Sequence, residues 1–260
     1  MKYINVKRLS IFLCFFCLNL YSYSLQDAIE SDLRSSVNQE RDIFRHPYET
    51  LSFFGISSDM TLVELSPGSG WYTEILAPYI GAGSGKFIAA AHDASKGSYQ
   101  KRSRERYEAK LSTNGAFDKV SIVNLGEVLA EKGSVDAVLT FRNLHSWLGP
   151  NMGSIFSQSF DALKSGGIFG IVTHRANPGT SVDEMKKSGY VTQELAIEEA
   201  KKVGFILVKT SEINANSKDT KNYEKGVWTL PPVLRLKEEG RAKYIEIGES
   251  DRMTLLFKKP

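Results

Sequence analysis

The sequence has very little cysteine: two residues in 260, Cys14 and Cys17, both within the first 24 positions. From position 25 onward there is none, which excludes disulfide bonds, thiolate metal sites and a cysteine nucleophile from that part of the chain. Histidine is also sparse, with four residues spread between positions 46 and 174. Without cysteines, this spacing does not form a zinc-ligand pattern, and we predict no metal site.

An apolar run long enough to span a membrane is missing as well. Residues 11–20 are apolar, but a stop-transfer helix needs roughly 20 such residues. Basic residues precede this run, and the small residues Ser22 and Ser24 follow it at the positions that a signal peptidase reads. We therefore predict that residues 1–24 are a signal peptide and that the protein is exported to the periplasm, with no stable membrane span after cleavage. An uncleaved leader that anchors the chain to the membrane is the alternative.

The chain also lacks a marked excess of charge. It has 33 basic and 30 acidic residues, and three of the basic ones fall in the predicted leader, so the remainder has 30 of each sign. No basic stripe stands out in the sequence. We therefore expect no nucleic-acid partner.

Segments with strand and helix patterns alternate along most of the chain. We expect strands at residues 61–65, 86–91, 120–125, 135–141, 167–173, 205–211 and 252–258, and helices at 72–80, 99–111, 155–163 and 192–203. This alternation predicts a mostly parallel sheet with right-handed crossovers, hence an α/β, doubly wound fold.

Two other segments stand apart from this alternation. Residues 25–58 are predicted to form an N-terminal helical extension, with one helix over 25–45 that Pro47 stops. The main domain then covers residues 59–260. Within it, residues 214–248 are polar and contain two adjacent prolines. An excursion of this length is more often a functional lid than a disordered loop.

The most informative motif joins the first predicted strand to the helix after it. The strand contains Glu64, and the chain then passes through Pro67-Gly68-Ser69-Gly70 directly into the helix. Glycines at such a turn let the backbone approach a ligand closely, and the helix N-terminus presents free N–H groups, which predicts a nucleotide-type cofactor. Thr73 occupies the position of the third glycine in the dinucleotide fingerprint, which argues against an NAD-dependent oxidoreductase.

A second carboxylate follows the next strand. Asp93 lies 23 residues beyond Gly70. A carboxylate at this place can accept hydrogen bonds from both ribose hydroxyls of a nucleoside cofactor. A solvated strand-end acid or a helix cap is the alternative.

Polar side chains also follow the fourth and fifth predicted strands. Arg142, Asn143 and His145 follow the fourth, and His174 ends the fifth. The carboxyl ends of strands in an open α/β sheet border the ligand crevice, so these side chains should face it. His145 is a candidate general base or orienting donor, or it braces the loop. A Ser-His-Asp hydrolase is poorly supported because the chain has no Gly-x-Ser-x-Gly elbow.

These motifs together resemble those of the class I S-adenosylmethionine-dependent methyltransferases. The first family motif is matched by Glu64-Leu-Ser66-Pro-Gly68-Ser-Gly70, and Asp93 falls where the family's second-strand acid holds the cofactor ribose. The likeness covers about residues 60–210 and implies a seven-stranded sheet whose last strand is antiparallel. One departure is that Ser66 replaces the first glycine of the motif.

More narrowly, the chain is similar to a bacterial group of predicted methyltransferases with leader peptides. The similarity rests on three strings, at residues 67–78, 226–232 and 247–253. The resemblance implies an S-adenosylmethionine-dependent methyltransferase that acts on a small molecule. The residues expected to bind the cofactor are Glu64, Ser66, Gly68, Gly70 and Asp93, and Arg142 and His145 are the expected catalytic residues at the acceptor. The alternative is an exported binding or scaffolding protein with this fold and no catalysis.

Overall fold

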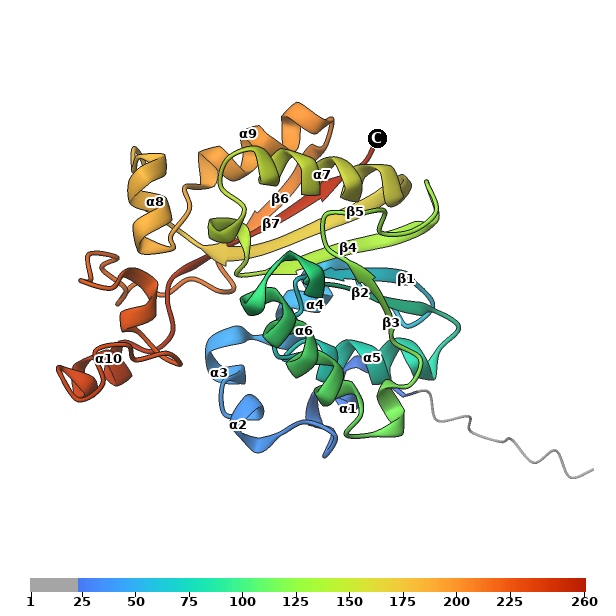
Figure 1. Ribbon diagram of the computed structural model, residues 1–260, viewed down its shortest axis with the longest axis horizontal. Coiled ribbons are helices and arrows are strands. Elements are labelled where there is room, and N and C mark those ends of the chain that lie inside the picture. The colour runs from blue at the N-terminus through green and yellow to red at the C-terminus, as the bar shows by residue number, and fades with distance from the viewer. Residues whose placement is uncertain (1–22) are drawn as a thin grey trace, which may run out of the picture.

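The computed structural model describes residues 23–260, so the predicted leader lies outside the described residues except for Tyr23 and Ser24. Seven strands form one sheet in the order β3-β2-β1-β4-β5-β7-β6 (Figure 1). The strands are β1 (Thr61–Leu65), β2 (Lys86–Ala91), β3 (Ser121–Asn124), β4 (Val135–Phe141), β5 (Leu163–His174), β6 (Ile206–Ser211) and β7 (Arg252–Lys258). β7 runs antiparallel to β5 and β6, and the other pairs are parallel. The predicted doubly wound fold with an antiparallel last strand is confirmed.

Helices cover both faces of this sheet. Beyond residue 60 the chain forms the helices α5 (Thr73–Ala82), α6 (Ser98–Leu111), α7 (Pro150–Ala162), α8 (Val182–Ser188), α9 (Gln193–Val203) and α10 (Arg241–Ile247), with short 3-10 turns η1 (Ala94–Lys96), η2 (Gly115–Phe117), η3 (Leu144–Ser146) and η4 (Gly226–Thr229). In Figure 1, α7 and α9 lie above the sheet, whereas α5 lies below it. Successive residues of a strand enter opposite cores: in β1, Val63 packs on the side of α7 and Leu62 on the side of α5. Burial on both faces explains why the central strands are almost continuously apolar.

The N-terminal extension differs from its prediction. Instead of one helix over 25–45, the chain forms α1 (Leu25–Glu30), α2 (Ser36–Gln39) and α3 (Asp42–Arg45), followed by α4 (Pro47–Phe54). The guanidinium group of Arg34 accounts for the break, because it donates to the carbonyl of Ile29 at 2.7 Å and to both carboxylate oxygens of Asp42 at 2.6 and 2.7 Å. These bonds fold the connection back on itself. Pro47 was predicted to stop a helix, and it also begins the next one, in the first turn of α4. A proline is favoured there because the N–H groups of the first turn have no partner within the helix.

The segment between β6 and β7 is held at its base by a buried polar network. Asp219 accepts from the hydroxyl of Tyr190 at 3.0 Å and from the backbone N–H of Asp251 at 2.7 Å. Asp251 in turn accepts from the backbone N–H of Asn216 and pairs with Lys221 at 2.7 Å. Figure 1 shows α10 at the outer end of this segment, away from the sheet. The role of residues 214–248 as a lid stays a prediction.

Among residues 23–260, no helix combines the length and the apolar character needed to cross a membrane.

Candidate functional site

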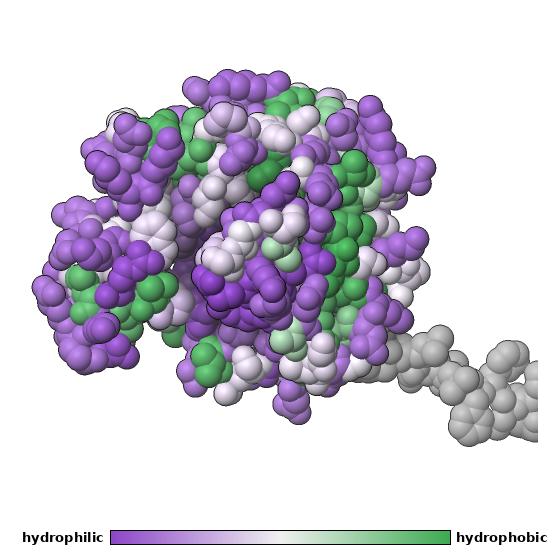
Figure 2. Space-filling model, in the orientation of Figure 1, coloured by the Kyte–Doolittle hydropathy of each residue, from purple (hydrophilic) through white to green (hydrophobic). Residues whose placement is uncertain are grey.

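A cavity of about 430 Å³ opens where β1, β4 and β5 end. Figure 2 shows this face hollowed between the α10 segment and the body of the molecule, with hydrophilic residues around the hollow. The lining comes from Arg41, Arg45, Glu64, Ser66, Gly68, Trp71, Tyr72, Arg142, Asn143, His145, His174, Trp228, Pro231, Glu249 and Ser250, among others. The sheet thus brings together most of the residues singled out in the sequence, as the rule for the carboxyl ends of parallel strands requires.

The glycine turn after β1 has the backbone that its sequence predicts. Gly68 and Gly70 have φ angles of 63° and 83°, in the left-handed region that favours glycine. Ser66 adopts φ 50°, so the serine that departs from the family motif takes a backbone conformation suited to glycine. A residue with a Cβ is strained there by roughly 1–2 kcal/mol. Glu64, Ser66 and Gly68 line the cavity directly, whereas Gly70 lies behind them in the same turn.

Glu64 is a buried acid with an unusual set of neighbours. Its carboxyl group accepts a hydrogen bond from Thr73 Oγ1 at 2.9 Å, and the hydroxyl of Tyr107 lies 3.1 Å from the same Thr73 oxygen. Burial raises the pKa of Glu64 to about 8, against the smaller opposing effect of the Thr73 hydrogen bond. None of the ion pairs among residues 23–260 includes Glu64. Thr73, which the sequence marked only as a missing glycine, is therefore the partner of this acid.

Asp93 lies at the carboxyl end of β2 but not in the cavity lining. Its carboxylate caps η1, accepting from the backbone N–H of Ser95 at 2.9 Å and from Ser95 Oγ at 2.8 Å. This contact is the helix cap that the sequence left open as an alternative. The predicted ribose role of Asp93 stays a prediction.

Asn143 ties the end of β4 to the glycine turn. Its amide nitrogen donates to the carbonyls of Leu65 and Ser66 at 3.0 and 3.2 Å and lies 3.1 Å from Thr140 Oγ1. Sequence reasoning placed Asn143 at the crevice without assigning it a partner. These bonds hold Ser66 in its strained conformation and fix the floor of the cavity.

His145 and His174 both line the cavity, and their rings lie side by side with centroids 5.8 Å apart. His145 Nδ1 is buried without a hydrogen-bond partner. The rings of His145 and Trp228 pack edge to face, with centroids 5.7 Å apart. Nδ1 of His174 lies 2.5 Å from Ser250 Oγ. Burial lowers the pKa of His145 to about 4 and that of His174 well below its usual value. Both imidazoles are therefore neutral near pH 7, and a neutral ring nitrogen can accept a proton.

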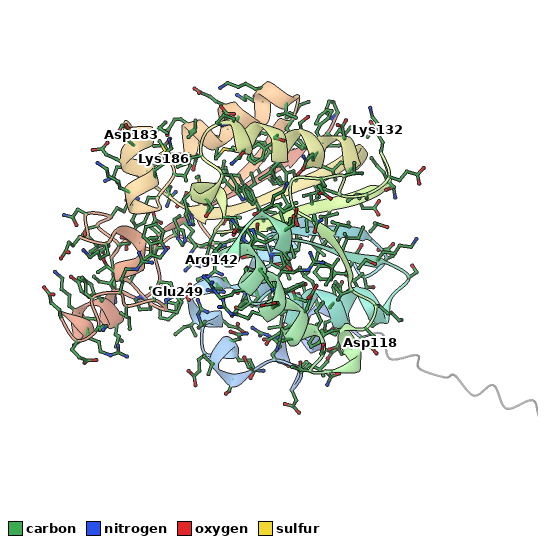
Figure 3. The ribbon with its side chains drawn as sticks, viewed as in Figure 1. Asp118, Lys132, Arg142, Asp183, Lys186 and Glu249 are labelled. Atoms are coloured by element: carbon green, nitrogen blue, oxygen red, sulfur yellow. The ribbon has the colours of Figure 1, made fainter. Side chains whose placement is uncertain are left out.

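Glu249, also in the cavity lining, forms ion pairs with four arginines. Its carboxylate lies 2.6 Å from Arg41, 3.1 Å from Arg45, 3.8 Å from Arg142 and 2.5 Å from Arg252. Figure 3 shows Arg142 and Glu249 close together between the sheet and the N-terminal extension. Sequence reasoning named Arg142 as a catalytic candidate and included Glu249 and Arg252 in the string at residues 247–253, but it missed Arg41 and Arg45. The spacing of Arg41 and Arg45 on one helical face was the available signal, but their partner lies more than 200 positions away.

Within residues 23–260, no group of three or more histidine or acidic side chains is arranged to hold a metal ion.

Neither a protein-family model nor a curated protein matches this chain. Solved structures do match it. An S-adenosylmethionine-dependent methyltransferase from Aquifex aeolicus aligns with 91% of this chain and 99% of its own, at 13% identity and a TM-score of 0.57. The geranyl diphosphate C-methyltransferase of Streptomyces coelicolor A3(2) aligns with 93% of this chain and 86% of its own, at 15% identity and a TM-score of 0.58. The 4+2 cyclase SpnF aligns with 91% of this chain and 92% of its own, at 14% identity and a TM-score of 0.60.

This is the fold of the S-adenosylmethionine-dependent methyltransferases. At these identities the likeness establishes the fold alone, and the class I resemblance seen in the sequence is confirmed at that level. The reaction must be argued from the site.

Proposed function

We propose that the protein is an S-adenosylmethionine-dependent methyltransferase that acts on a small molecule. The observation that carries the proposal is the cavity at the ends of β1 and β4. There a glycine turn borders the buried Glu64, which has no ion-pair partner among the described residues. The methyltransferase structures with this fold support it, including one solved with geranyl diphosphate and S-adenosyl-L-homocysteine. No observation on the described residues supports the alternative of a binding protein without catalysis.

The residues around the turn fit this cofactor. The ammonium group of the cofactor would be the cationic partner that Glu64 lacks. Its positive charge would favour the ionised form of Glu64. The backbone at Ser66, Gly68 and Gly70 would approach the methionine part of the ligand, and Asp93 is the proposed partner of the ribose. When bound, S-adenosylmethionine would supply a methyl group on a sulfonium centre for in-line transfer to the acceptor.

On the acceptor side, the chain would position the nucleophile and take up its proton. His145 Nδ1 is buried and unpartnered, so it can accept a hydrogen bond from the acceptor, and because burial lowers its pKa to about 4 it would hold a released proton only transiently. Arg142 would orient the acceptor. Trp228 and Pro231 border the same cavity and would exclude water from it.

Calorimetry tests the cofactor assignment through the proton balance. At pH 7 Glu64 is mostly protonated, because its pKa is about 8. We expect S-adenosylmethionine to bind the full chain with release of about one proton, measured in buffers of different ionisation enthalpy. Glu64→Gln should lose this release, and Glu105→Gln, an exposed substitution on α6, should keep it. Absence of binding to the wild-type protein contradicts the proposal.

We further propose that the chain belongs to the leader-peptide-bearing bacterial methyltransferases and is exported to the periplasm, an uncleaved membrane anchor being the alternative. The support is the basic start, the apolar run at residues 11–20 and the small residues after it. Cell fractionation with N-terminal sequencing tests the localisation. A periplasmic product that begins near Leu25 supports export, a full-length membrane-bound product supports the anchor, and a full-length protein in the cytosol contradicts both.

A further inference from the structure

The cavity wall around Glu249 is strongly positive. Three guanidinium groups in the lining and that of Arg252 behind it, against one carboxylate, leave a net of three positive charges at this place. Glu64, the other acid in the lining, adds no charge near neutral pH because burial raises its pKa to about 8. The chain itself therefore leaves the positive charge of this wall uncompensated, although residues 23–260 carry equal numbers of acidic and basic residues.

Arg45 has unused hydrogen-bonding capacity at the cavity. Its side chain is only 2% exposed, and its Nε is bonded to Glu249 at 3.1 Å. Nη1 and Nη2 are buried without any hydrogen-bond partner, and the guanidinium carbon lies 4.6 Å from the centre of the Trp71 ring. Contact with an aromatic face does not replace hydrogen bonds, and leaving charged donors unpaired in a buried site is costly. A ligand oxyanion would satisfy both nitrogens.

Arg41 and Arg142 line the same cavity and keep partly exposed side chains, at 20% and 25%. Arg252 differs: it is not part of the lining, and its nitrogens bond to Glu249 and to the carbonyl of Phe44. The three lining arginines therefore face the cavity, whereas Arg252 pairs with Glu249 behind them. Guanidinium forks match carboxylate and phosphate groups in shape as well as charge.

We propose that the methyl acceptor carries an oxyanion, a carboxylate or a phosphate, which Arg41, Arg45 and Arg142 bind in this cavity. The proposal rests on the proposed function, and it names the substrate class of the same site. The sulfonium centre of the cofactor adds another positive charge to this cavity, which makes an anionic acceptor the better electrostatic complement. Glu249 is a positioning residue that spaces the guanidinium groups.

A second source of the same chemistry is the carboxylate of the cofactor itself, and the test must separate the two. Calorimetry at constant ionic strength would measure binding of succinate, inorganic phosphate and the neutral succinamide to the full chain. Each titration would be run with and without saturating S-adenosylhomocysteine, which carries the cofactor carboxylate. The variants are Arg41→Gln and Arg142→Gln, and the matched control is Arg106→Gln, an exposed arginine of α6 outside the cavity.

We expect at least one of the two anions to bind, succinamide not to bind, and anion affinity to fall by about tenfold or more in Arg41→Gln and Arg142→Gln but not in Arg106→Gln. Anion binding should persist when S-adenosylhomocysteine is bound. The comparison of succinate with succinamide on the wild-type protein needs no variant, so it holds even if a substitution impairs folding.

Three results would overturn the proposal. They are binding of neither anion to the wild-type protein, equal anion binding by the cavity variants and the control, and displacement of the anion by S-adenosylhomocysteine, which would assign the arginines to the cofactor carboxylate. If succinate binds but S-adenosylhomocysteine does not, the proposed function fails and only the anion site stands.

Discussion

Glu64 connects the sequence motif to the chemistry of the site through one buried carboxyl group. The motif predicted an acid beside the glycine turn, and the structure places it in the cavity wall. Its protonation could not be predicted, because it depends on burial and, in the opposite direction, on the hydrogen bond from Thr73, neither of which the motif reveals. The same limit applies to Ser66, whose left-handed backbone is held by Asn143 at the end of the neighbouring strand β4.

The buried Glu64 should make stability depend on pH. Its pKa rises from 4.5 in the unfolded chain to about 8 in the folded one, so the folded state binds more protons between these values. The contribution is fully present below pH 4.5 and is lost as pH rises through 8, by up to about 5 kcal/mol. We expect urea unfolding between pH 5 and 9 to show the wild-type protein losing stability relative to Glu64→Gln.

His145 and His174 remain in both proteins, so the difference between the two curves isolates Glu64. A difference in unfolding free energy that stays constant across this pH range would show that Glu64 is ionised in the folded state.

At the scale of elements, the sequence predicted the sheet well and the segments around the cavity poorly. All seven strands are present, because alternation of apolar strands and helices is a local signal; only β5 begins clearly earlier, at Leu163. The prediction of one helix over residues 25–45 was wrong because Arg34 bonds to Asp42, and helical periodicity does not reveal such a contact. Likewise, α8 and α10 are short helices of seven residues each, which give too little periodicity to detect.

The packing of η4 on α8 makes a prediction about the segment between β6 and β7. A Cβ at Gly226 would lie 2.1 Å from the carbonyl oxygen of Ser188, and its φ is 55°. We expect Gly226→Ala to destabilise this segment by about 2–4 kcal/mol and to expose residues 214–248 to limited proteolysis. Gly133→Ala is the matched control, because Gly133 has φ 69° but no atom within 4 Å of such a Cβ. Equal protease resistance of the two variants would contradict this packing.

For the molecule as a whole, the floor and the roof of the cavity belong to different parts of the chain. The floor is fixed to the sheet by Asn143, whereas the roof includes Trp228 and Pro231 in the excursion before β7. If residues 214–248 act as a lid, ligand binding should reduce the mobility of the roof. We expect amide hydrogen exchange in residues 226–233 to slow when S-adenosylhomocysteine and succinate are bound, while exchange in α9, outside the cavity, stays unchanged. Unchanged exchange at 226–233 under confirmed binding would exclude a lid.

The position of β7 in the chain determines the order in which the sheet can form during synthesis. In the sheet formed by residues 23–260, β6 pairs only with β7, yet β7 follows it along the chain by about 40 residues. During synthesis, β6 therefore leaves the ribosome well before the strand that joins it to the sheet. Glu249 and Arg252 emerge with β7, so the nascent chain completes its sheet and its arginine cluster in the same late event. Anion binding should therefore appear only once β7 has joined the sheet.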